Sequence, residues 1–255
     1  MPTDTPSEPL DPFEEPPSPP PPSLASMKLE AGATSRSATA SASPFKRESV
    51  STFSLRWRAR LAGLSLLAYV PLLLMMGWVT DTIIETRPDF SPEQRALANL
   101  VGYTLLTVFL IGALAVSLWV WRASKILRRL GAVTPAYSAP LAVASFYIPV
   151  WNLWRPYVVV RAIWQASINP NDWDNVAVSQ VLPLWWLAWL GHAGSLLVGM
   201  ALEPIVIGEH RQFMESIVLI LFVGSGVVGA LCLLSIIRRT THRLIHQLNA
   251  RRTVN

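Results

Sequence analysis

Four long apolar runs constrain how this chain folds more than any other feature. They cover residues 61–80, 97–121, 181–201 and 217–237, and none contains Asp, Glu, Lys or Arg. About 20 apolar residues are enough for a helix to cross the hydrocarbon core of a bilayer. A helix also satisfies its backbone hydrogen bonds within one segment, as lipid requires. We therefore predict an all-α membrane protein with four transmembrane helices.

The composition supports a membrane protein over a soluble one. Of 255 residues, 51% are hydrophobic and only 15% are charged, with a formal net charge of +5. The basic residues lie beside the apolar runs, a pattern that favours anionic lipid headgroups on the cytoplasmic side over nucleic acid. We expect the lipid bilayer as a partner and no nucleic acid.

Residues 1–50 differ in composition from the rest of the chain. Ten of the 21 prolines lie within the first 22 residues, and a Ser/Ala/Thr-rich stretch follows. Such a segment buries too little apolar surface to offset the entropy of ordering it. We predict a disordered cytoplasmic tail, acting as a tether or, through Pro19–Pro22, as a polyproline ligand. No apolar stretch follows Met1 as in a signal peptide, and Met27 is an alternative start.

The second apolar run has a clear helix start. Ser91, Pro92 and Gln94 supply an N-cap, a proline in the first turn and the third-position partner of a capping box. Pro71 lies inside the first run and is expected to kink its helix.

The basic residues orient the spans. With Lys28 and Arg36 set aside as remote, four spans leave 16 basic residues on one side of the membrane and three on the other. The positive-inside rule then places both termini in the cytoplasm. We expect the protein to lie in the plasma membrane. The spans form one domain over residues 56–240, and a basic amphipathic tail follows over 238–255.

A further apolar segment lies between the second and third spans, over residues 140–167. As a fifth span it would invert everything downstream and place the last five arginines outside. Residues 168–180 contain Asp172 and Asp174 and no basic residue, which favours that inversion. We give the five arginines more weight, because acidic residues contribute little to the positive-inside rule. We therefore predict a re-entrant or interfacial helix-break-helix on the cytoplasmic side, the elbow.

The elbow carries the main candidate site for a protein partner or lipid. Asn152 is placed to cap a following helix or to bond backbone freed by proline, and Arg155 to meet a phosphate, a carboxylate or exposed carbonyls. The tryptophans are expected at headgroup depth. The alternative is a purely structural bend at the membrane surface. The candidate residues are Pro149, Trp151, Asn152, Trp154, Arg155, Pro156, Arg161 and Trp164.

His192 is a candidate intramembrane polar site, because an ionisable side chain near the middle of a span marks a functional position by default. A neutral histidine bonded across the bundle is the simpler interpretation. In the fourth span, the Gly224–Gly229 face has small residues that suit close helix packing, within the bundle or in a homo-oligomer. His242 and His246 have the spacing of helical metal ligands, but no carboxylate or thiol accompanies them.

Catalytic motifs are absent from the sequence. It contains no nucleophile elbow, no phosphate-binding glycine loop and no histidine–carboxylate metal motif. A single cysteine, Cys232, excludes an intrachain disulfide. We expect no enzyme activity, no cofactor, and no catalytic or metal-binding residue.

Several of these features together resemble a bacterial membrane protein family known only as domain of unknown function 4328. The resemblance extends over about residues 56–240. It rests on Trp57 and Arg60, the run from Ile148 to Pro156, Trp164-Gln165-Ala166-Ser167, and the pair Trp185-Trp186. It implies a multi-span membrane protein and supplies no activity.

Two functions fit these observations. The first is a non-enzymatic membrane module that presents the elbow to a protein partner or lipid. The second is a channel or carrier for a small neutral solute, with His192 lining the path. The two differ in whether a polar cavity reaches His192.

Overall fold

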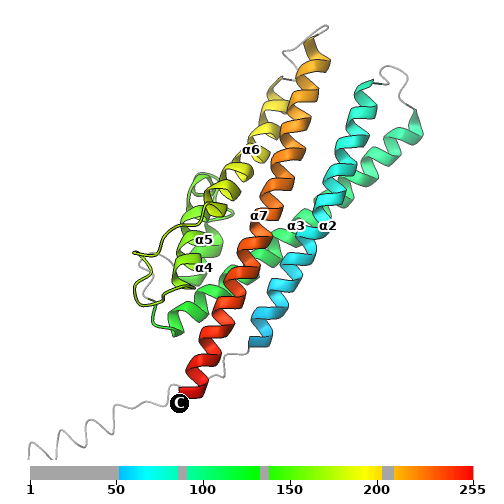
Figure 1. Cartoon of the computed structure of the whole chain (residues 1–255). Coiled ribbons are helices and arrows are strands. Elements are labelled where there is room, and N and C mark those ends of the chain that lie inside the picture. Colours follow the sequence, from blue (N-terminus) through cyan, green and yellow to red (C-terminus); the bar gives the residue numbers. More distant parts are fainter. Residues whose placement is uncertain (1–51, 86–90, 133–137, 203–209, 255) are drawn as a thin grey trace, which may run out of the picture. The chain divides into compact units, whose positions relative to one another are not determined.

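The structure is a computed structural model that describes residues 52–85, 91–132, 138–202 and 210–254. All regular structure in these ranges is helical. The elements, labelled in Figure 1, are α2 (Thr52–Glu85), α3 (Pro92–Arg129), α4 (Ala139–Ala144), the 3₁₀ helix η1 (Trp151–Leu153), α5 (Arg155–Ala166), α6 (Val181–Leu202) and α7 (His210–Val254). The predicted tail over residues 1–50 lies outside the described ranges.

Four helices are long and apolar enough to cross a membrane, namely α2, α3, α6 and α7. Each contains one of the predicted spans, so the prediction of an all-helical chain with four candidate transmembrane helices is confirmed. The helices are longer than the apolar runs because backbone hydrogen bonding continues into the polar flanks. α2 continues through Pro71 as a single helix.

Both ends of α3 follow from local sequence. The predicted capping box is present: Gln94 N donates to Ser91 Oγ at 3.2 Å, and Ser91 N donates to Gln94 Oε1 at 2.9 Å. At the other end, Gly131 has a φ of 82°, which favours glycine. Its neighbour Ala132 donates its N–H to Leu127 O at 3.1 Å, and this Schellman motif ends the helix.

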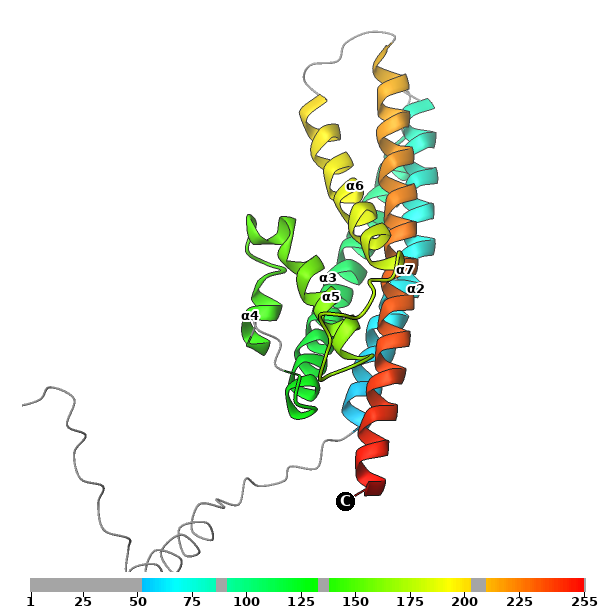
Figure 2. The same cartoon turned by 60° about the vertical axis from the view of Figure 1, so that its left-hand side comes forward.

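The long helices pack as two pairs, α2 with α3 and α6 with α7, and α2 joins the pairs by packing against α7. Figures 1 and 2 show α7 between α2 and α6. Small residues of α7 form the contact with α6. The Cα of Gly229 faces Ala188, and Ser225 faces Gly191. Part of the Gly224–Gly229 face is therefore used within the bundle.

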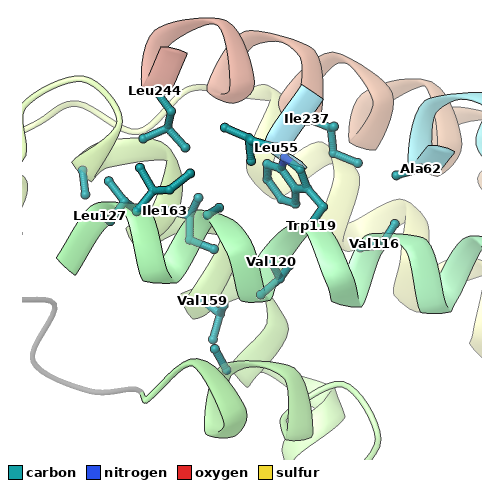
Figure 3. Close-up of a cluster of buried hydrophobic side chains, with 14 of the residues drawn as sticks. Leu55, Ala62, Val116, Trp119, Val120, Leu127, Val159, Ile163, Ile237 and Leu244 are labelled. Atoms are coloured by element: carbon teal, nitrogen blue, oxygen red, sulfur yellow. The ribbon is translucent and has the colours of Figure 1, made fainter. Parts of the chain in front are cut away.

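A hydrophobic core fills the end of the bundle near the C-terminal half of α3 (Figure 3). Trp119 is fully buried at its centre, and its Nε1 donates to Thr241 Oγ1 on α7 at 2.9 Å. Leu55 of α2 and Ile163 of α5 pack in the same cluster. One core thus joins α2, α3, α5 and α7.

The C-terminal part of α7 belongs to this core. Residues 238–254 continue α7 without a break instead of forming a separate segment. Leu244 is fully buried, and Leu248 is nearly so. Further along, Arg251 Nη2 donates to Leu130 O at 2.7 Å. The apolar residues that predict an amphipathic tail pack against α3 and α5.

Residues 139–166 fold as two short helices with a break between them. Ser138 caps α4, and Pro140 lies in its first turn. Pro149 lies in the turns that separate α4 from η1, and Pro156 lies in the first turn of α5. The N-cap of α5 is Trp154, so of the two roles predicted for Asn152, that of capping the following helix is wrong. α5 ends at Ala166, before Asn169 and Pro170.

Candidate functional site

The predicted elbow residues divide into an exposed tip and a buried base. Pro149, Val150, Leu153 and Trp154 are exposed at the tip. Arg155 is held there, because its guanidinium lies 4.2 Å from the centre of the Trp151 ring. This cation–π contact fixes the direction of the arginine at the start of α5.

The base of the elbow is tied to the rest of the bundle. Trp164 is only 3% exposed and packs among α6 residues such as Leu182 and Trp185. The guanidinium of Arg243 lies 4.3 Å from the centre of the Trp164 ring. Trp164 is therefore buried in the protein instead of being displayed at its surface, because α5 turns this face towards α6 and α7.

Arg161 also acts within the fold. Its Nε donates to Gln165 Oε1 at 3.2 Å, and Gln165 Nε2 donates to Val176 O at 2.6 Å. Gln247 Nε2 of α7 donates to Ser167 O at 2.9 Å. These bonds fasten the end of α5 and the following segment to α7.

His192 forms the other predicted site, and both its ring nitrogens are hydrogen-bonded. Its Nε2 lies 2.9 Å from the Oη of Tyr69 on α2, and its Nδ1 lies 2.8 Å from Phe222 O on α7. The imidazole also stacks on the Phe222 ring at a centroid distance of 4.2 Å. One buried histidine on α6 thus connects three helices, which is the bonding across the bundle that the sequence favours.

Gly226 makes room for this histidine. A Cβ at Gly226 would lie 2.7 Å from His192 Nδ1 and 2.5 Å from Leu73 Cδ2. Both distances are too short for carbon contacts in proteins. Only glycine therefore lets the imidazole and Leu73 approach the backbone of α7 at this point.

Two cavities meet at the Tyr69–His192 pair. The larger has a volume of about 750 Å³ and extends to Arg211 and Glu215 near the start of α7. The smaller has a volume of about 400 Å³ and extends towards the elbow. Tyr69, His192, Phe109 and Trp189 line both. The rings of Phe109 and Trp189 are stacked, with centroids 6.1 Å apart, and bridge α3 and α6.

The smaller cavity brings the two predicted sites together. Asn152 and Pro156 of the elbow line it along with His192. Tyr147, also from the elbow, shares a hydrogen bond of 2.8 Å with Ser117 of α3 at its edge. The elbow is therefore one wall of a cavity that reaches His192.

Sequence reasoning missed Tyr69, Phe109 and Trp189. A search for polar side chains near the middle of other spans finds Tyr69, because a buried hydrogen-bonding group needs a partner. No sequence signal pairs it with His192, from which it is separated by 123 positions. The aromatic pair is indistinguishable from core residues without the fold.

In the described ranges, no group of three or more His, Cys, Asp or Glu side chains is placed so that it could hold a metal ion. His242 and His246 lie near each other, with ring centroids 4.9 Å apart, on the exposed side of α7.

The fold defines a class: the regular structure in the described ranges is helical and includes four helices long and apolar enough to cross a membrane, which indicates a membrane protein. The family model described as Domain of unknown function (DUF4328) matches residues 91–242, and the chain belongs to this family. The match begins at Ser91, so Trp57 and Arg60 lie outside it. No curated protein and no solved structure matches the chain.

Proposed function

We propose that this chain is a non-enzymatic, multi-pass protein of the plasma membrane that presents its elbow to lipid or a protein partner. In this proposal both termini lie in the cytoplasm, and residues 140–167 enter the membrane from that side and return. The observation that carries the proposal is the exposed apolar tip of the elbow. Val150 and Leu153 are 63% and 59% exposed, as expected of side chains that meet lipid or a partner.

A contact between the elbow and α3 supports a re-entrant path. Tyr147 bonds to Ser117, which lies four residues inside the predicted end of its span at Trp121. At 1.5 Å per residue, Ser117 lies roughly 6 Å inside the end of the predicted span, so Tyr147 of the elbow reaches past that end. Backbone that is not helical is tolerated at such a depth where it is buried in protein or lines a water-filled cavity. Asn152 and Pro156 of the elbow line the smaller cavity.

Cysteine labelling tests the path. In a Cys232→Ser background, Ser138→Cys and Asn171→Cys flank the elbow. A membrane-impermeant maleimide should label both in inverted vesicles and neither in spheroplasts. Val150→Cys and Leu153→Cys at the tip should react slowly in both preparations. Labelling of Asn171→Cys from the spheroplast exterior would establish a fifth span and refute the re-entrant elbow.

A quantitative pull-down tests the presentation of the elbow. Asn152→Ala and Arg155→Ala should reduce recovery of the proteins or lipids that copurify with the wild type, while membrane insertion stays unchanged. Asn171→Ala, beyond α5 and exposed, is the matched control. Equal recovery with all three variants would contradict a role for the elbow in binding.

The two cavities support a second candidate, a channel or carrier for a small neutral solute. They approach the Tyr69–His192 pair from opposite ends of the bundle, so the pair lies where a path across it would narrow. Glycerol and urea flux into proteoliposomes tests this candidate. A flux that His192→Leu abolishes supports it, and permeation no faster than through protein-free liposomes rejects it.

A further inference from the structure

The partners of His192 determine where its hydrogens lie. A carbonyl oxygen only accepts, so His192 Nδ1 carries the proton that it donates to Phe222 O. A charged imidazole would be costly to bury among apolar side chains, so the ring is neutral and Nε2 presents a lone pair. The hydroxyl of Tyr69 therefore donates its proton to Nε2.

This chain of bonds leaves Tyr69 as an acceptor only. Its one hydroxyl proton is used on His192, while the oxygen retains a lone pair. Tyr69 lines both cavities. A molecule in either cavity that carries an O–H group can donate to this oxygen, whereas an ether or a ketone cannot. The Tyr69–His192 pair thus favours a ligand that can donate a hydrogen bond.

The larger cavity suits a molecule that comes from the lipid phase. Of the side chains that line it, Leu106 is 53% exposed, Leu196 54% and Met200 66%. All three lie within the apolar spans of α3 and α6, so the cavity opens towards the hydrocarbon core. Its volume of about 750 Å³ falls within the roughly 300–1,000 Å³ typical of ligand pockets.

Charge narrows the choice of ligand. Among the described residues, Arg211 and Glu215 are the charged side chains that line the larger cavity, and they form an ion pair of 2.8 Å. A phospholipid would have to bring its charged headgroup to the depth of Tyr69, at high cost. A single hydroxyl that bonds to Tyr69 carries little such cost.

We infer that the larger cavity between α3 and α6 is a binding site for a neutral lipid alcohol, whose hydroxyl donates to Tyr69 Oη and whose apolar body lies between Phe109, Trp189 and the lipid. This site goes beyond the proposed role of the elbow and requires no transport. Gly226 supports the site indirectly, because it makes room for the His192 ring that bonds to Tyr69.

The test uses hexadecanol with a mid-chain diazirine and the methyl ether of the same molecule, which lacks only the donor. The full-length protein is reconstituted in nanodiscs, photolabelled, and its labelled peptides are identified by mass spectrometry. We expect the alcohol to label the segments of α3 and α6 that line the cavity about 3- to 10-fold more than the ether, the value of one hydrogen bond.

Two variants separate the hydrogen bond from the cavity. Tyr69→Phe alone would leave His192 Nε2 as a free acceptor in the same cavity, so the double variant Tyr69→Phe/His192→Leu is used to abolish the preference for the alcohol. Tyr103→Phe, on the exposed side of α3 and outside both cavities, should retain it. Gly102→Phe should reduce labelling by both probes, because no neighbouring atom lies within 4 Å of a Cβ there and the ring would fill the cavity.

Each outcome decides the inference. Equal labelling by alcohol and ether in the wild type would overturn it, as would a preference that survives in Tyr69→Phe/His192→Leu. If that double variant fails to fold, Gly102→Phe still decides: labelling of the α3 and α6 segments that remains at the wild-type level in that variant means that the probes bind outside the cavity. None of these results depends on the elbow, whose path the cysteine labels test separately.

Discussion

Tyr69 and His192 join the two helix pairs of the bundle, with Oη and Nε2 2.9 Å apart. Tyr69 belongs to the α2–α3 pair and His192 to the α6–α7 pair. Because the second ring nitrogen bonds to Phe222 O, the histidine cannot rotate without losing both partners. The pair therefore fixes the separation of the helices at the point where both cavities end.

Gly226→Ala should destabilise the bundle by about 1–3 kcal/mol, the usual cost of overpacking a core. The new methyl group would displace the His192 ring or Leu73. Unfolding in SDS, followed by circular dichroism, measures the change. Gly224→Ala is the control on the same helix, since no atom lies within 4 Å of a Cβ there. Similar losses in the two variants would show that helix propensity or lipid contact, and not the histidine, sets the effect.

Leu244→Ala should cost about 2–5 kcal/mol, as for other buried leucines. The side chain is fully buried in the core that α3 and α5 share with α7. Leu231→Ala, half exposed on the same helix, should cost much less. The measurement is again the free energy of unfolding in SDS. A small loss at Leu244 would mean that the C-terminal part of α7 lies at the membrane surface, as its amphipathic pattern suggests.

The sequence was sufficient to predict the helices but not how they pack. Apolar length identifies the four spans, and the capping box at Ser91 identifies a helix start, because both are local properties. The C-terminal end of α7 shows what a local pattern cannot predict. A stripe of apolar residues such as Leu244 and Leu248 fits a lipid surface and a protein core equally well, and only the position of α3 decides.

The candidate site was predictable in its parts and not in their combination. His192 stands out because it is ionisable within an apolar span, and Asn152 because it is a polar residue between the two prolines Pro149 and Pro156 of the elbow. Their sharing of one cavity depends on how α6 packs against the elbow, which no local pattern encodes. Gly226 carries no sequence signal of its role, since glycine is common in membrane helices.

Deletion of residues 1–49 should leave membrane insertion and unfolding in SDS unchanged. The described part of the chain begins at Thr52, and the core described above lies entirely within it. Fluorescence-detected size-exclusion chromatography of the two forms checks the expectation. A deletion that begins to remove α2, for example of residues 1–57, is the comparison, because it removes the fully buried Leu55. Aggregation of the shorter deletion would show that the tail is needed for folding.

The hydrogen bond between Trp119 and Thr241 should contribute about 0.5–1.5 kcal/mol to stability, the net value of a buried bond. A double-mutant cycle isolates it. Trp119→Phe removes the donor and some core volume, while Thr241→Val removes the acceptor at nearly constant shape. Thr241→Val should lower the free energy of unfolding less in the Trp119→Phe background than in the wild type, and the difference is the energy of the hydrogen bond. Additive losses would instead mean that packing alone holds α3 against α7 here, and that the indole nitrogen contributes no net stability. Trp78→Phe, on the exposed face of α2, controls for loss of the indole itself.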